Sequence, residues 1–140
     1  VKTVYANAEI RAELRPFFAD LPRRLAEAHL VIARSGAGTV AELMAIGRPA
    51  ILVPLPGAMD DHQTDNAAFL SRAGAGWLLT QKTLDAGSLA QTLQTLLRDP
   101  SALAAKAEAA HKLAIPHAAD NLADMVEQLA RSSDKKRRAA

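Results

Sequence analysis

Two polar segments of this 140-residue chain contain residues that could bind a phosphorylated ligand. The first is the run RSGAGT, residues 34–39, whose glycines and alanine let a backbone approach a ligand closely. Where a helix follows such a loop, the free N–H groups of its first turn suit a phosphate. A diphosphate is therefore the ligand that we expect at this loop.

The same loop also has a purely structural interpretation, because a turn of small residues between a strand and a helix allows close packing. The loop lacks the third glycine of G-x-G-x-x-G and the lysine of the P-loop. Thr39 and Glu42 have the spacing of a capping box, in which Thr39 caps a helix and Glu42 bonds to the cap residue's N–H. Alternatively, Glu42 lies in the first helical turn and accepts hydrogen bonds from two ribose hydroxyls. The sequence leaves both interpretations open.

The second segment, residues 53–67, carries a dense cluster of polar side chains that includes Asp60, Asp61, His62, Gln63, Asp65 and Asn66. An amide such as Gln63 suits sugar hydroxyls, because it donates and accepts hydrogen bonds at once. Asp60 and Gln63 also have the spacing of a capping box. Metal binding is not expected, because three consecutive polar residues at one helix start do not converge easily on an ion. No catalytic triad or carboxylate pair is evident.

Short apolar runs alternate with helical patterns, as is typical of βαβ units and a parallel sheet. The sequence predicts buried strands at residues 30–33 and 50–53 and a third strand at 76–79, with helices at 39–46 and 61–72 between them. Right-handed crossovers bring the ends of the first two strands to one sheet edge, where α/β folds bind ligands. We therefore expect both polar segments to face one crevice.

The flanking regions are predicted to be mainly helical. Residues 13–15 suggest a short strand, and residues 20–28 a helix. Three further helices are expected at 88–97, 100–113 and 121–130, the last two capped by Asp99 and Asp120. In the last helix Leu122, Met125, Val126 and Leu129 share one face, so we expect that helix to dock on another surface.

Composition indicates one globular domain, with 49% hydrophobic and 23% charged residues. No apolar run approaches the ~20 residues of a membrane-spanning helix. The absence of cysteine excludes a disulfide framework and zinc or redox chemistry based on cysteine. Five of the 17 basic residues follow residue 130, which leaves 12 basic and 14 acidic residues before it. We therefore expect residues 131–140 to be a basic, disordered tail, and we do not expect nucleic acid as a partner.

The chain begins at Val1, and no charged n-region or apolar h-region follows. We expect it to start inside a longer polypeptide, so that residues 1–130 form a ligand-binding domain incomplete on its amino-terminal side.

Residues 28–81 resemble the donor-binding domain of the MurG family, the bacterial UDP-N-acetylglucosamine transferases that complete the lipid-linked peptidoglycan precursor. The resemblance rests on R-S-G-A-x-T-V-x-E at 34–42, G-x-P-A-I-L-V-P at 47–54 and D-H-Q-x-x-N-A at 61–67, in the family's order. It extends more weakly through residues 16–21 and to the last helix. The resemblance implies a Rossmann-like α/β parallel sheet with flanking helices and a helical tail, the C-terminal half of a GT-B glycosyltransferase.

The resemblance also implies UDP-N-acetylglucosamine (UDP-GlcNAc) as the ligand. The backbone at Phe18 would contact the uracil, Ala37 to Thr39 the diphosphate, Glu42 the ribose and Gln63 the GlcNAc hydroxyls. Position 38 varies within the family. The substrate-binding residues implied are Phe18, Ser35, Gly36, Ala37, Gly38, Thr39, Val40, Ala41, Glu42, Gln63 and Asn66.

By the same resemblance, the full-length enzyme transfers GlcNAc to the lipid-linked muramyl-pentapeptide with inversion, in peptidoglycan biosynthesis and hence cell shape and division. It would be cytoplasmic, peripheral on the inner membrane. An N-terminal domain outside this chain would hold the lipid acceptor and the general base. We therefore expect no catalytic residue, cofactor or metal here, and no activity from the fragment alone. Two alternatives remain open: the donor subunit of a bipartite GT-B transferase, and a non-catalytic nucleotide-binding or interaction module.

Overall fold

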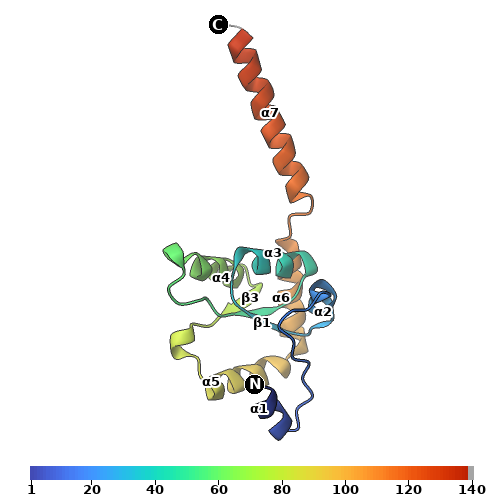
Figure 1. Ribbon diagram of the computed structural model, residues 1–140, viewed down its shortest axis with the longest axis vertical. Helices are drawn as coiled ribbons and strands as arrows, with labels where there is room; N and C mark the ends of the chain where they lie inside the picture. Colours follow the sequence, from blue (N-terminus) through green and yellow to red (C-terminus); the bar gives the residue numbers. More distant parts are fainter. Residues whose placement is uncertain (139–140) are drawn as a thin grey trace.

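The chain folds around three short parallel strands with helices packed beside them (Figure 1). A computed structural model describes the backbone of residues 1–138 and the side chains of residues 1–131. In chain order the elements are α1 (Lys2–Asn7), α2 (Leu21–Glu27), β1 (Val31–Ala33), α3 (Ala37–Ile46), β2 (Ala50–Leu52), the 3-10 turn η1 (Met59–Asp61), α4 (His62–Arg72), β3 (Gly76–Leu78), the 3-10 turn η2 (Gln81–Thr83), α5 (Ala86–Leu97), α6 (Pro100–Lys112) and α7 (Ala118–Arg138).

The sheet has the order β1-β2-β3, with both pairs parallel, as the alternation of strands and helices predicted. Right-handed crossovers place α3 and α4, which connect these strands, on the same face of the sheet. The register requires a glycine at the start of β3, because a Cβ on Gly76 would lie 2.8 Å from the carbonyl oxygen of Ala50. Every residue of β2 is buried, so the central strand anchors the sheet.

The core lies between the sheet, α3, α4 and α6. Its buried residues are Val40, Leu43, Ala50, Leu52, Ala67, Leu70, Ala75 and Ala110. The alanines let the elements approach closely while the leucines fill the space between them. At the end of α3, Gly47 adopts a left-handed conformation with φ of +70°, and a Cβ there would lie 3.0 Å from the Cβ of His111 on α6. The α3–α6 contact thus also requires a glycine.

Several details differ from the sequence prediction. Residues 13–15 form no strand, because no neighbouring strand is there to bond with them among the described residues. The strand at 30–33 is not fully buried: β1 is an edge strand, and the side chain of Ile32 is 47% exposed. Asp99 does cap α6, through a bond to the N–H of Ala102.

The last helix also differs, because α7 begins at Ala118 and places Asp120 inside the helix rather than at its cap. It continues to Arg138, where we expected a disordered tail; the arginines and lysines of this segment are residues that favour a helix. Residues 139–140 of that expected tail lie outside the described residues.

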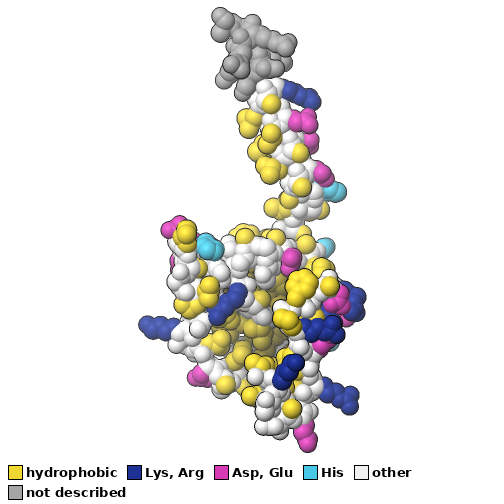
Figure 2. All heavy atoms as spheres, viewed as in Figure 1, with side chains coloured by type: hydrophobic (Ala, Val, Ile, Leu, Met, Phe, Trp, Pro, Cys, Tyr) yellow, Lys and Arg dark blue, Asp and Glu magenta, His cyan; other side chains and the backbone are white. Residues whose placement is uncertain are grey.

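The helix α7 extends away from the rest of the molecule (Figures 1 and 2). Hydrophobic side chains gather along one side of it: Leu122, Met125, Val126 and Leu129, each between 58% and 64% exposed. The prediction that these side chains share one helix face is therefore confirmed. Within the described part of the chain, no helix combines the length and apolar character needed to cross a membrane.

Truncating a core leucine tests the packing of α3. Leu43 is fully buried, whereas Leu97 at the end of α5 is 54% exposed. We expect Leu43→Ala to lower the free energy of unfolding by about 2–5 kcal/mol, because it removes buried methyl groups and leaves a cavity.

Urea denaturation followed by Trp77 fluorescence measures this loss, and Leu97→Ala is the matched control, expected to change stability far less. Equal losses in the two variants would contradict the proposed core.

Candidate functional site

The two polar segments meet at the carboxyl ends of β1 and β2, as the topology predicted. The hydroxyl of Ser35 donates to the backbone carbonyl of Gln63 at 2.7 Å, and the side-chain amide of Asn66 donates to the carbonyl of Ser35 at 2.9 Å. Ser35 is fully buried between these partners. These two bonds therefore join the loop after β1 to the start of α4.

The two polar segments are thus in direct contact, where we expected an open crevice between them. A cavity of about 440 Å³ lies between the loop after β2, the start of α4 and the segment after β3. Its lining residues are Pro54, Leu55, Pro56, Asp61, Thr64, Thr80, Gln81 and Lys82. The segment after β3 therefore takes part in this edge of the sheet, a contribution that the sequence analysis missed.

The side chain of Gln63 is oriented by the second loop. Its Oε1 accepts a hydrogen bond from the N–H of Leu55 at 3.0 Å, and this leaves the Nε2 hydrogens available to donate. The proposed capping box of Asp60 and Gln63 is wrong. Asp61 is the N-cap of α4, it makes no side-chain capping bond, and both aspartates adopt left-handed conformations. Gln63 faces the preceding loop and not the helix start.

The first loop leads directly into α3, whose N-cap is Gly36. The N–H of Val40 bonds to the carbonyl of Gly36 and closes the first turn, so Thr39 lies within the helix. The capping box of Thr39 and Glu42 is therefore wrong, and so is the placement of Glu42 in the first turn. Glu42 lies one turn later with an exposed side chain. The N–H groups of residues 37–39 have no acceptor within the helix and can bind an anion.

Packing does not account for the glycines of this loop. A Cβ added to Gly36 or Gly38 would meet no atom within 4 Å, whereas one added to Gly76 would collide with a backbone oxygen. The space above the start of α3 is open. Of the two interpretations left by the sequence, close approach of a ligand is the one that this geometry favours.

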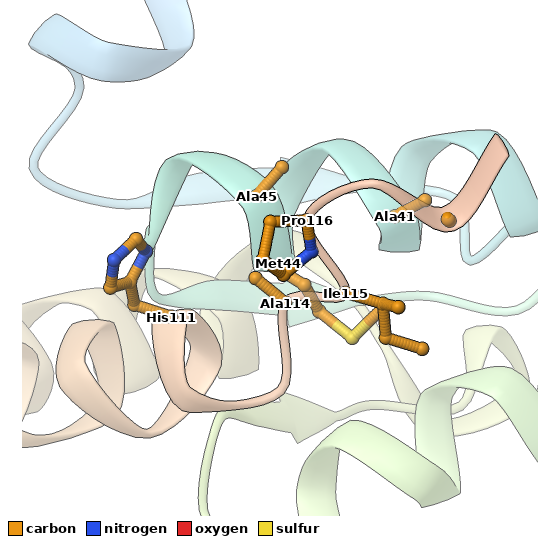
Figure 3. A pocket seen from close by; sticks show the side chains of 8 residues that line it. Ala41, Met44, Ala45, His111, Ala114, Ile115 and Pro116 are labelled. Atoms are coloured by element: carbon orange, nitrogen blue, oxygen red, sulfur yellow. The ribbon is translucent and has the colours of Figure 1, made fainter. Parts of the chain in front are cut away.

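Two other residues expected to bind substrate lie elsewhere. Val40 belongs to the core and is 6% exposed. Ala41 lines an apolar cavity of about 650 Å³ between α3 and the segment that joins α6 to α7 (Figure 3). Its other lining residues are Met44, Ala45, His111, Ala114, Ile115, Pro116 and Ala118. A cavity of this composition offers few partners for a polar nucleotide.

Phe18 lies in the irregular segment before α2, and its ring contacts α2 rather than the two loops. The guanidinium of Arg24 lies 4.3 Å from the ring centroid. Glu13 and Asp20 hold Arg24 in place, with bonds of 2.6 Å and 2.7 Å to the two carboxylates. The structure thus brings Ser35, Gln63 and Asn66 together and places Phe18 in a separate cluster with α2.

The ion pairs of this cluster shift the pKa values of its side chains. Hydrogen bonds from Arg24 and Arg23 lower the pKa of Asp20 to about 2, and the bond from Arg24 has the larger effect. The bond from Arg24 also lowers the pKa of Glu13, while Glu13 and Asp20 raise the pKa of Arg24.

One more residue at the sheet edge was not among the expected substrate-binding residues. The guanidinium of Arg34 donates to the carbonyls of Val53 and Pro54, at 3.2 and 3.0 Å, and to the side-chain oxygen of Gln81 at 2.7 Å. Gln81 follows β3, so the rule that strand ends share one edge could have included it.

The site can therefore bind but offers little for catalysis. Helix N–H groups suit a phosphate, the Nε2 of Gln63 donates, and the carboxylate of Glu42 accepts. No group of three or more histidine or acidic side chains is placed to hold a metal ion in the described part of the chain.

The chain resembles known proteins in both sequence and structure. Residues 1–126 match the model of the glycosyltransferase family 28 C-terminal domain. The chain is 52% identical, over 131 residues, to the UDP-N-acetylglucosamine--N-acetylmuramyl-(pentapeptide) pyrophosphoryl-undecaprenol N-acetylglucosamine transferase of Nitrobacter hamburgensis, covering 94% of this chain and 35% of that protein. It is also 52% identical to the protein of the same name from Rhodospirillum rubrum, covering 90% of this chain and 33% of that protein.

Among solved structures, the crystal structure of Acinetobacter baumannii MurG matches with a TM-score of 0.84 and 36% identity. The match covers 91% of this chain and 37% of that one. The chain therefore spans about a third of the length of these relatives.

Changing Asn66 tests the junction of the two loops. Asn66→Asp keeps the shape of the side chain but replaces the donor to the carbonyl of Ser35 with a charged acceptor. We expect a loss of about 1–3 kcal/mol in unfolding free energy at neutral pH, the cost of leaving a buried partner unpaired.

Urea denaturation provides the measurement, and Asn121→Asp makes the same chemical change on the exposed surface of α7. If the two substitutions were equally mild, the Asn66–Ser35 bond would not support the site.

The Arg24 cluster makes a prediction about pH. Because folding lowers the pKa of Asp20, its ion pairs stabilise the fold above pH about 3.9 and are lost as pH falls towards 2. Arg24→Gln should return the pKa of Asp20 towards its ordinary value.

An NMR titration of the Asp20 carboxyl carbon measures this shift. Arg23→Gln is the comparison, and a smaller rise is expected because Arg23 is the weaker partner. If the pKa of Asp20 rose more in Arg23→Gln than in Arg24→Gln, Arg23 and not Arg24 would be its stronger partner.

Proposed function

Since the chain belongs to glycosyltransferase family 28, as a C-terminal domain of that family, we propose that it binds the sugar nucleotide UDP-GlcNAc as a glycosyl donor. The relatives' names specify an N-acetylglucosamine transferase, and nucleotide sugars are the donors that such reactions use. The donor lies over the start of α3 in this proposal.

The observation that carries the proposal is the open space above that helix start. Neither Gly36 nor Gly38 is required by packing, and the backbone N–H groups of residues 37–39 are free to bind a diphosphate. The positive end of the helix dipole favours the same charge. A diphosphate is the part of the donor that these features match.

The remaining contacts follow from the groups that the fold leaves available. The exposed carboxylate of Glu42 lies one turn along α3 and accepts from the ribose hydroxyls. The Nε2 of Gln63 donates to GlcNAc hydroxyls, because its Oε1 is bonded to Leu55. The backbone at Phe18 contacts the uracil, and Ser35 and Asn66 act by holding the loop after β1 against the start of α4.

The longer protein would transfer GlcNAc to a lipid-linked muramyl-pentapeptide in peptidoglycan synthesis, at the cytoplasmic face of the inner membrane. The acceptor's hydroxyl displaces UDP with inversion, and the N–H groups at the start of α3 stabilise the charge of the leaving diphosphate. The acceptor site and the base belong to the two thirds of the relatives' length that this chain does not cover. The chain alone binds the donor and transfers nothing.

Ligand binding to this chain tests the proposal. UDP-GlcNAc and UDP, titrated into isotope-labelled chain, should give saturable NMR shifts that centre on residues 36–42 and Gln63. ADP, which carries adenine in place of uracil, is the control for recognition of the nucleobase and should bind more weakly than UDP. Absence of saturable shifts at millimolar UDP would refute the proposed function.

The role of Glu42 gives a sharper prediction. Glu42→Ala should weaken UDP binding by about 1.5–3 kcal/mol, because hydrogen bonds to a carboxylate are lost. Thermal stability should hardly change, since Glu42 is exposed and does not cap the helix.

The control is Glu108→Ala, which removes an exposed carboxylate from α6. Calorimetric titration compares the three proteins, and equal UDP affinity in all of them would exclude Glu42 as a ribose ligand.

A further inference from the structure

The side chain of Arg34 spans the ends of all three strands of the sheet. It follows β1 directly, its Nη1 donates to two carbonyls at the end of β2, and its Nη2 donates to Gln81 in η2, beyond β3. A guanidinium can do this because its donors point outwards in a rigid planar fork. The ammonium group of a lysine is compact, so it cannot reach acceptors this far apart.

The loop after β2 depends on these bonds because it has few of its own. Pro54 and Pro56 have no N–H, so Leu55 supplies the only backbone donor between them. That donor bonds to the side chain of Gln63. The carbonyls of Val53 and Pro54 receive their hydrogen bonds from Arg34. Apart from the backbone bonds of Val53 to Ala33 and of Ala58 to Leu55, the loop is held by the side chains of Arg34 and Gln63.

The orientation of Gln63 follows from the position of this loop. If the carbonyl of Pro54 moves, the N–H of Leu55 moves with it, and the Oε1 of Gln63 loses its partner. The amide is then free to rotate, and its Nε2 no longer has one direction. Arg34 therefore acts on Gln63 without touching it.

We propose that Arg34 is a positioning residue of the donor site, which fixes the Pro54–Leu55–Pro56 loop and thereby aims the Nε2 of Gln63 at the sugar. This proposal rests on the proposed function. It predicts that Arg34 serves recognition of the sugar more than binding of the nucleotide, because the diphosphate is bound by the start of α3.

A direct role for Arg34 as a phosphate ligand is the competing explanation, since the residue adjoins the loop at the start of α3. The geometry favours the positioning role, because three of the five guanidinium donors, both on Nη1 and one on Nη2, already bond to the protein. The two explanations predict different effects of Arg34→Lys on ligand binding. A lysine keeps the charge that a phosphate needs but cannot bond to all three acceptors.

The first experiment needs no ligand. In Arg34→Lys, hydrogen exchange at the Leu55 amide should accelerate by about tenfold or more, because its bond to Gln63 opens more often. Exchange at the core amides of Leu43 and Ile51 should stay unchanged. Gln81→Ala should give a smaller acceleration, and adding it to Arg34→Lys should add little, because both changes break the same contact. Arg72→Lys makes the same substitution on an exposed residue of α4 and should leave Leu55 unaffected.

The second experiment measures dissociation constants for UDP-GlcNAc and for UDP in the same proteins. Arg34→Lys should weaken UDP-GlcNAc binding by about tenfold, the loss expected for one poorly oriented hydrogen bond, and UDP binding much less. The ratio of the two constants is the readout, because general destabilisation would weaken both ligands together.

The outcomes separate this proposal from the function on which it rests. An unchanged ratio, or unchanged exchange at Leu55, in Arg34→Lys overturns the positioning role while leaving donor binding intact. Equal weakening of UDP and UDP-GlcNAc in Arg34→Ala, with full affinity in Arg34→Lys, identifies a phosphate ligand instead. If the unchanged chain binds neither compound, the proposed function falls and the donor-site role of Arg34 falls with it.

Discussion

Backbone groups at the carboxyl ends of parallel strands must find hydrogen-bond partners outside the sheet, and the rest of this site depends on how they do so. Here the partners are side chains from neighbouring segments. Ser35 and Asn66 join the loop after β1 to the start of α4, and Arg34 donates to two carbonyls beyond β2. A buried polar group without a partner is costly, so these contacts fix the loops firmly relative to the sheet.

The same requirement divides the polar groups of this edge into two sets. One set is used by the fold, and it includes the hydroxyl of Ser35 and the Oε1 of Gln63. The other set is left available: the N–H groups at the start of α3, the carboxylate of Glu42 and the Nε2 of Gln63. A binding site needs both, because available groups select a ligand only when the backbone that carries them is rigid.

The segment around Phe18 is held in a different way. It forms no strand, and Arg24 attaches it to α2 through two carboxylates and the face of the aromatic ring. Exposed ion pairs stabilise weakly one by one, and several that share one guanidinium define a geometry more firmly. The uracil end of the proposed site therefore depends on ion pairs, whereas the diphosphate and sugar ends depend on hydrogen bonds between side chains and backbone.

The sequence by itself determined the parallel α/β architecture, because apolar runs and helical periodicity reflect burial directly, and the family pattern identified the two loops. It could not decide which polar groups serve the fold. Capping-box spacing at Thr39–Glu42 was misleading, because the N-cap of α3 is Gly36 and not Thr39. The hydrogen bonds of Arg34 join residues up to 47 positions apart. The predictions of a strand at residues 13–15 and of full burial for β1 were also wrong, because both features depend on which segments lie beside them. The spacing of neighbouring residues indicates which local structures are favourable. The hydrogen-bond partners of a side chain are determined only when distant segments pack together.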